Sequence, residues 1–140
     1  YQLTDALSAL MNQGKVFLPG TVSDWMDCGN KAITVETNSK MLGYLKGKPE
    51  LRGGNITLKN SEIIEPCYIG SNVVLKNAKI GPNVSLGNNC VIEDATIKGS
   101  LIQTNSIITN IDLKDSMIGN HAHIDGRWTS VSLGDYSRMD

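Results

Sequence analysis

Aliphatic residues recur along the second half of the chain at a spacing that neither a helix nor an ordinary strand produces. One register, with steps of five or six residues, holds only isoleucine and leucine: Ile64, Ile69, Leu75, Ile80, Leu86, Ile92, Ile97, Ile102, Ile108, Leu113, Ile118 and Ile124. A second register, three or four residues later, holds small residues or valine with the exception of Ile111: Cys67, Val73, Ala78, Val84, Cys90, Ala95, Ser100, Ser106, Ile111, Ser116 and Ala122. A helix repeats about every 3.6 residues and a strand about every 2. A different architecture is therefore needed.

A coiled β-solenoid explains both registers. Each unit supplies a short strand with one aliphatic side chain pointing inward and a turn with one small residue in the corner, and three units close a triangular coil. Glycine and asparagine in IGSN, IGPN, LGNN and IGNH suit tight corners, because a positive φ costs these residues little. The pattern predicts a mainly β fold, a parallel β-helix of hexapeptide repeats over residues 55–140. Ile64 is expected to be its first inward residue, with Ile63 pointing outward.

The outward residues predict an interface. Side chains alternate along a strand, so the neighbours of each inward residue point to solvent. One face should be wet, with Lys79, Lys98 and Lys114 outside. The other two faces carry aliphatic outward residues: Val74, Val91, Leu101, Ile107 and Met117. Soluble monomers rarely leave such residues contiguous in water, so we expect them to contact another copy of the chain or a further domain.

The first part of the chain predicts two helices. Residues 3–13 read as a short helix with Thr4 as its N-cap and Gly14 just past its end. Residues 30–45 read as a second helix, capped by Asn30. The stretch between them reads as two extended pieces around a turn at Pro19 and Gly20.

The domain boundaries follow from these elements. Residues 46–54 (KGKPELRGG) are expected to form a linker between residues 1–45 and the β-helix of residues 55–140. Forty-five residues of α/β structure are too few for an independent core. We therefore interpret residues 1–45 as the end of a larger α/β domain.

Composition narrows the class of protein. The chain has 13 Lys and Arg against 14 Asp and Glu, so nucleic acid and anionic membranes are not expected partners. Its three cysteines, Cys28, Cys67 and Cys90, are widely spaced and form no CxxC pair, which argues against a disulfide framework or a thiolate zinc site. Neither a signal peptide nor an apolar run of roughly 20 residues is present. These features predict a soluble, cytoplasmic protein.

Two short motifs resemble a known family. Tyr1-Gln2-Leu3-Thr4-Asp5 precedes a helix, and Trp25-Met26-Asp27-Cys28-Gly29 follows about twenty residues later. Together they resemble the closing section of the sugar-phosphate nucleotidyltransferase domain, notably in long-form glucose-1-phosphate thymidylyltransferases, where the second motif runs tryptophan, apolar residue, aspartate, any residue, glycine. Long-form members carry a hexapeptide β-helix after that domain, and Leu133-Gly134-Asp135-Tyr136-Ser137-Arg138 resembles their terminal coil. The resemblance implies a left-handed parallel β-helix, often trimeric, after a small α/β remnant of a nucleotidyltransferase domain.

The resemblance also implies a chemistry. Such enzymes convert a nucleoside triphosphate (NTP) and a sugar 1-phosphate to an NDP-sugar and pyrophosphate, with Mg²⁺ gathering the negative charges. Asp27 matches one of the family's metal-binding aspartates. The second carboxylate and the glycine-rich phosphate loop have no counterpart here, since Gly53-Gly54 lies in the expected linker without a preceding strand. No catalytic site is expected to be complete in this chain, which should be inactive alone.

Other interpretations remain open at this stage. Asp27 also fits an ordinary turn carboxylate before Gly29. Hexapeptide β-helices also form acyltransferases with a catalytic histidine, and His121 and His123 are expected to point outward beside the insertion Arg127-Trp128-Thr129. Finally, the β-helix fits a purely structural oligomerisation module. The sequence does not identify the nucleotide base or the sugar.

Overall fold

The computed structural model describes residues 2–126, 132–136 and 138–139 of this mainly β protein. Three helical elements come first, namely α1 (Leu3–Asn12), α2 (Lys31–Tyr44) and the short 3₁₀ helix η1 (Pro49–Leu51). The strands that follow are β1 (Thr57–Lys59), β2 (Glu62–Ile63), β3 (Cys67–Ile69), β4 (Val74–Lys76), β5 (Lys79–Ile80), β6 (Val84–Leu86), β7 (Val91–Lys98), β8 (Leu101–Ile102), β9 (Ile107–Lys114), β10 (Met117–Ile118), β11 (His123–Asp125), β12 (Ser132–Leu133) and β13 (Arg138–Met139). Arg127-Trp128-Thr129 and Ser137 lie outside the described residues.

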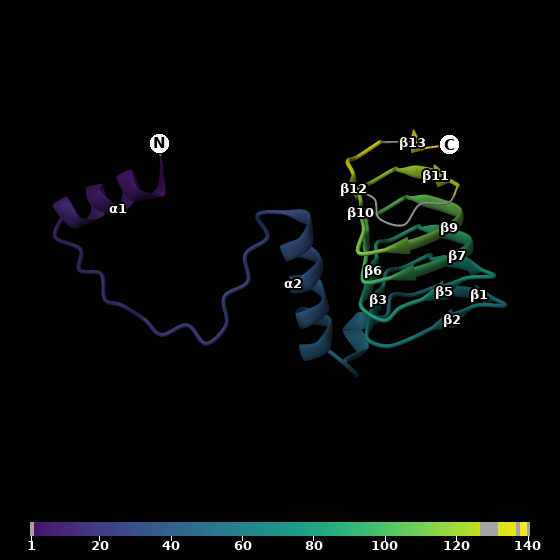
Figure 1. Ribbon diagram of the computed structural model, residues 1–140. Helices are drawn as coiled ribbons and strands as arrows, with labels where there is room; N and C mark the ends of the chain where they lie inside the picture. Colours follow the sequence, from purple (N-terminus) through teal and green to yellow (C-terminus); the bar gives the residue numbers. More distant parts are fainter. Residues whose placement is uncertain (1, 127–131, 137, 140) are drawn as a thin grey trace.

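The strands stack into a parallel β-solenoid with three faces (Figure 1). The first face contains β1, β4, β11, β13 and the first halves of β7 and β9, and the second contains β2, β5 and the second halves of β7 and β9. The third face contains β3, β6, β8, β10 and β12. Paired strands are successive passes of the same chain around the solenoid, as the sequence pattern predicted.

Both sequence registers form the core. From Ile69 to Ile124, every inward aliphatic residue is at most 2 % exposed, and the small residues of the second register are also buried. The three buried serines are all hydrogen-bonded: Ser100 and Ser116 donate within their own corners to Lys98 O and Lys114 O at 2.6 and 2.9 Å, and Ser106 donates to Gly119 O at 2.9 Å. The predicted inward positions are confirmed over this range.

The first coil departs from the predicted register. Ile63, and not Ile64, pairs with Ile80 and packs against the core. The prediction that Ile64 points inward and Ile63 outward is therefore wrong. The first coils of the solenoid contain 17 residues each, as the spacing of Asn60 and Asn77 shows. The prediction instead assumed 16 residues from Ile64 to Ile80.

Two glycines differ in how much space surrounds them, because adjacent coils of the solenoid pack closely and the surface of α2 is open. A Cβ atom at Gly87 would lie 2.6 Å from Thr104 N in the next coil, whereas one at Gly43 in α2 would meet nothing within 4 Å. We expect Gly87→Ala to destabilise the protein by about 1–3 kcal/mol. Gly43→Ala should instead stabilise it by about 0.5 kcal/mol, because alanine favours the helix. Urea unfolding followed by circular dichroism measures both, and equal effects would contradict the close coil stacking.

The predicted N-cap residue is confirmed for α2 and is wrong for α1. Asn30 caps α2, accepting a hydrogen bond from Ile33 N at 3.1 Å. In contrast, α1 begins directly after Gln2, so Thr4 lies inside the helix and is not its N-cap. The reason is that the Asp5 carboxylate accepts from Gln2 N at 3.0 Å, which stabilises an earlier start. Gly14 follows the end of α1 with a φ of 80°, as expected.

Helix α2 packs lengthwise on the third face of the solenoid (Figure 1). Val35 and Leu42 are buried, and Ser85 of β6 donates to Asn38 Oδ1 at 2.7 Å. The expected linker, residues 46–54, contains η1 and ends against the first complete coil, where Arg52 pairs with Ile69. This contact anchors α2 to the base of the solenoid.

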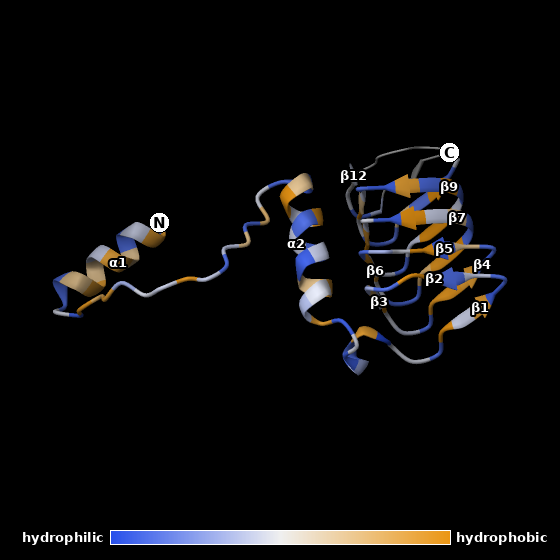
Figure 2. Cartoon of the chain, turned by 60° about the horizontal axis from the view of Figure 1, so that its bottom comes forward, coloured by the Kyte–Doolittle hydropathy of each residue, from blue (hydrophilic) through white to orange (hydrophobic). Residues whose placement is uncertain are grey.

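The stretch of residues 2–29 has no core of its own. Helix α1 buries none of its residues and stands apart from α2 and the solenoid (Figures 1 and 2). Its large apolar residues are exposed, and so are those of the segment after it: Leu3, Leu7, Leu10, Met11, Val16, Phe17, Leu18, Val22 and Trp25. Within the described chain these apolar side chains are not buried, and the stretch meets α2 only near its end, where Tyr44 hydrogen-bonds to Asp24.

Candidate functional site

The segment that contains Asp27 runs beside α2. Tyr44 Oη donates to Asp24 Oδ2 at 2.6 Å, and Thr34 Oγ1, which donates to Asn30 O at 2.8 Å, also lies 3.3 Å from Cys28 O. The hydrogen bond to Asp24 raises the pKa of Tyr44 above its ordinary value. These contacts hold the residues on either side of Asp27, whose own side chain is exposed.

Asp27 belongs to no cluster of three or more potential metal ligands in the described chain. Its Oδ1 atom lies close to Gly29, 3.4 Å from the position that a Cβ atom on residue 29 would take. Among the residues that the structure describes, no three histidine, cysteine, aspartate or glutamate side chains come together as a metal site. Asp27 can therefore contribute at most part of a metal site, and Trp25 beside it is 81 % exposed.

The five aliphatic residues of the expected interface form two aligned stripes. Val74, Val91 and Ile107 are partners on the first face, where Ile107 is 42 % exposed. Leu101 and Met117 are partners on the third face, where they line a hollow of about 280 Å³. The stripes lie on separate faces of the prism.

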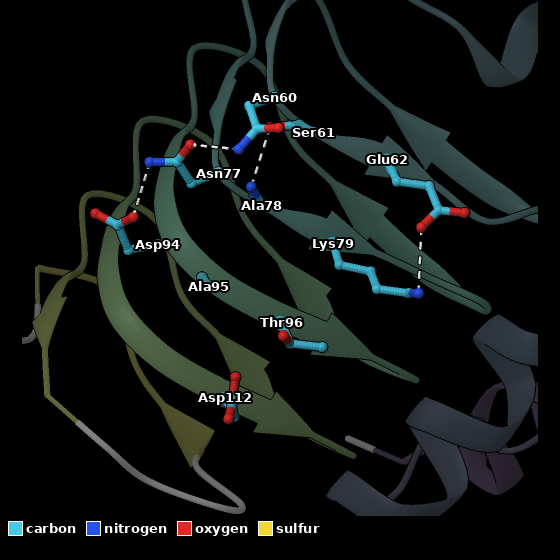
Figure 3. Close-up of a pocket in the computed structure, with 10 residues that line it drawn as sticks. All are labelled: Asn60, Ser61, Glu62, Asn77, Ala78, Lys79, Asp94, Ala95, Thr96 and Asp112. Carbon is cyan, nitrogen blue, oxygen red and sulfur yellow. Dashed lines mark hydrogen bonds and ion pairs between the residues drawn. The ribbon is translucent and has the colours of Figure 1, made fainter.

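The second face is polar, and Lys79, Lys98 and Lys114 are exposed there. Its hollow of about 590 Å³ is shown in Figure 3. Lys79 forms an ion pair with Glu62 at 3.2 Å, and Asn60, Asn77 and Asp94 are hydrogen-bonded in series. The lining contains neither histidine nor cysteine, and its Ser61 hydroxyl is engaged with the backbone, donating to Lys59 O at 2.9 Å and accepting from Ala78 N at 3.0 Å.

The two histidines occupy different environments. His121 is exposed at a coil corner, where its ring stacks on Tyr136 with a centroid distance of 4.8 Å. Its Nε2 atom lies 3.3 Å from Asn105 Nδ2. His123 is half-buried on β11, in register with Ile107. Within the described residues neither ring has a carboxylate hydrogen-bond partner, so the orienting group of an acyltransferase base is not seen.

The three cysteines are free thiols. Cys28 is exposed, whereas Cys67 and Cys90 lie in the core. Burial raises the pKa of both buried thiols, and this disfavours the reactive thiolate. Cys67 and Cys90 are packing residues.

Columns of hydrogen-bonded side chains at the corners were not predicted from the sequence. The asparagines at 55, 72, 89 and 105 take a positive φ, and each of the first three donates to the next one along the solenoid. Their recurrence every 16 or 17 residues is the signal that points to this stacking.

Comparisons with protein-family models, curated proteins and solved structures found no match to this chain. No helix among the described residues has the length and apolarity to cross a membrane. The chain is a mainly β parallel solenoid preceded by two α-helices.

Proposed function

We propose that this chain is the C-terminal part of a cytoplasmic sugar-1-phosphate nucleotidyltransferase, in which a left-handed β-helix serves assembly or regulation. The exposed apolar stretch of residues 2–29 carries the proposal, because such a surface is stable in water only when further protein covers it. The same stretch contains the Trp25–Gly29 motif that resembles the family. In this proposal the stretch completes a nucleotide-binding domain.

Asp27 has a defined role in this proposal. An exposed aspartate is a hard oxygen donor, which suits Mg²⁺. When bound, the ion would neutralise charge on the nucleotide and sugar phosphates. The contacts of Asp24 with Tyr44 and of Cys28 with Thr34 would position the carboxylate from both sides. The remaining ligands would come from residues outside this chain.

The proposal predicts that the 140-residue chain alone neither turns over dTTP nor binds it tightly. The phosphate contacts and the second carboxylate are supplied by other sequence. Isothermal titration calorimetry with dTTP and Mg²⁺ measures this, and low-micromolar binding would contradict the expectation. In the complementary experiment, a longer protein that contains this chain should release pyrophosphate from an NTP and a sugar 1-phosphate. Absence of release across all common NTP and sugar 1-phosphate pairs would overturn the proposed function.

We further expect the solenoid to assemble as a homo-oligomer, with a trimer favoured. In a trimer each copy would use two faces, which matches the stripe of Val74, Val91 and Ile107 and that of Leu101 and Met117, whose hollow on the third face is lined by no residue of α2. Light scattering should give a multiple of the chain mass for the wild type. The Val91→Lys, Ile107→Lys double variant should be smaller, because charges would be buried at the contact.

The second face offers a matched control for this test. Thr96 and Asp112 are partners there, in the same two strands as Val91 and Ile107. The Thr96→Lys, Asp112→Lys variant should keep the wild-type mass. A monomeric wild type, or equal effects of the two double variants, would exclude the stripes as the contact between copies.

A further inference from the structure

One corner of the solenoid carries an uninterrupted column of hydrogen-bonded side chains, which we name the amide ladder. It consists of Asn55, Asn72, Asn89, Asn105 and His121, all with φ between 55° and 61°. The bonds between successive asparagines measure 3.1, 3.0 and 2.9 Å. Asn105 and His121 close the series at 3.3 Å. The ladder thus joins the base of the solenoid to its last coils.

All four amides point in the same direction. In each bond between asparagines, Nδ2 donates to the Oδ1 atom one coil further along. Asn105 Nδ2 faces His121 Nε2, which must then be an unprotonated acceptor with the ring proton on Nδ1. A neutral His121 is therefore compatible with this direction of the whole ladder.

Protonation of His121 reverses this requirement. Nε2 becomes a donor, and two donors then face each other at Asn105. Rotating the Asn105 amide by half a turn restores the bond with a charged donor, which is the stronger kind. The mismatch then moves to Asn89, and rotation of Asn89, Asn72 and Asn55 in turn would carry it to the free end of the ladder.

The surroundings of His121 allow this change. The ring is exposed and stacks on Tyr136, a geometry that also suits an imidazolium over an aromatic face. The Asp135 carboxylate accepts from the neighbouring Asn120, at 2.8 Å from its N and 3.1 Å from its Nδ2. In the described part of the chain, no other titratable side chain forms a hydrogen bond, ion pair or ring contact with His121.

A second column provides an internal comparison. Asn60 donates to Asn77 at 2.9 Å, and Asn77 donates to Asp94 at 3.0 Å (Figure 3). This column ends on a carboxylate, which in its ionised form only accepts. Its direction is fixed by Asp94 and does not depend on His121.

We propose that the amide ladder is a pH-responsive relay. When His121 gains a proton, all four amides reverse, and Asn55 presents a donor where it previously presented an acceptor. Asn55 lies three residues after Arg52, where the chain enters the solenoid from η1 and α2. The last coils thereby change the hydrogen-bonding surface at the base of the solenoid. This inference does not depend on the proposed nucleotidyltransferase function.

Side-chain NMR of the ¹⁵N-labelled protein tests the relay between about pH 8 and 5, the range in which histidine changes charge. The NH₂ resonances of Asn55 and Asn72 should shift with the same midpoint as the His121 ring. Those of Asn60 and Asn77 should not follow that midpoint. If His121 titrates while Asn55 stays unchanged, or if both columns respond alike, the relay is excluded.

Two variants separate the relay from general pH effects. His121→Asn continues the ladder with a group that does not titrate, so the shifts of Asn55 and Asn72 should disappear. His123→Asn removes the other histidine, which lies outside the ladder, and should leave those shifts intact. Retained shifts in His121→Asn would overturn the proposal. Should that variant fail to fold, the comparison of the two columns in the wild type still decides.

Discussion

Replacing Ile97 by alanine is expected to destabilise the protein by about 2–5 kcal/mol. Ile97 is fully buried and stands between Ile80 and Leu113 in adjacent coils of the second face. Alanine removes buried apolar surface and leaves a cavity, because the coils above and below are held by backbone hydrogen bonds and cannot close it. Each coil is buried mainly by its neighbours, so the loss should weaken the centre of the stack.

Urea unfolding of the wild type and the Ile97→Ala variant measures this loss. Lys98→Ala is the matched control, since Lys98 is adjacent in β7 but exposed. Its effect should stay within about 0.5 kcal/mol. Similar losses for the two variants would show that the inward and outward positions of β7 have been assigned wrongly.

Hydrophobic spacing was sufficient to predict most of the solenoid. Between Ile69 and Ile124 the regular spacing of isoleucine and leucine identified the inward residue even where two aliphatic residues are adjacent, and burial confirms it: Ile108 is fully buried, whereas Ile107 beside it is 42 % exposed. At the first coil Ile63 and Ile64 are adjacent and equally apolar. The choice between them depends on coil length, which the backbone pairing with Ile80 fixes and the pattern does not.

The starts of α1 and α2 show a similar limit of prediction from the sequence. At Asn30 only one good capping side chain precedes the helix, and it caps α2 as predicted. Near α1, Thr4 and the Gln2–Asp5 pair compete, and the carboxylate contact with Gln2 N favours the earlier start. Capping propensities of single residues do not rank such alternatives.

The candidate site could be predicted from the sequence only in part. The motif around Asp27 identified a carboxylate, and the structure shows how Tyr44 and Thr34 hold the residues beside it. Those partners come from α2, so their contacts depend on how the segment lies against that helix. The amide ladder was missed for a related reason. The sequence indicates corner asparagines, whereas their bonding direction depends on the group at the end of the column.

The proposed function makes its strongest prediction at Asp27. In the longer enzyme, Asp27→Asn should lower kcat by about 10²- to 10³-fold, since a neutral amide is a much poorer ligand for Mg²⁺. The side chain is exposed, and no hydrogen bond of its own holds the fold among the described contacts. Stability should therefore be nearly unchanged, and the activity should recover partly as Mg²⁺ is raised.

Asp24→Asn is the matched control for this variant. Asp24 lies three residues earlier in the same segment and accepts from Tyr44 at 2.6 Å, a bond that the asparagine oxygen can still accept. This variant removes an equal charge and should keep a near-normal kcat. Steady-state kinetics over a range of Mg²⁺ concentrations compares the two. A near-normal Asp27→Asn enzyme would show that Asp27 is an ordinary turn carboxylate, and an equal loss in Asp24→Asn would point to a general effect of charge on the segment.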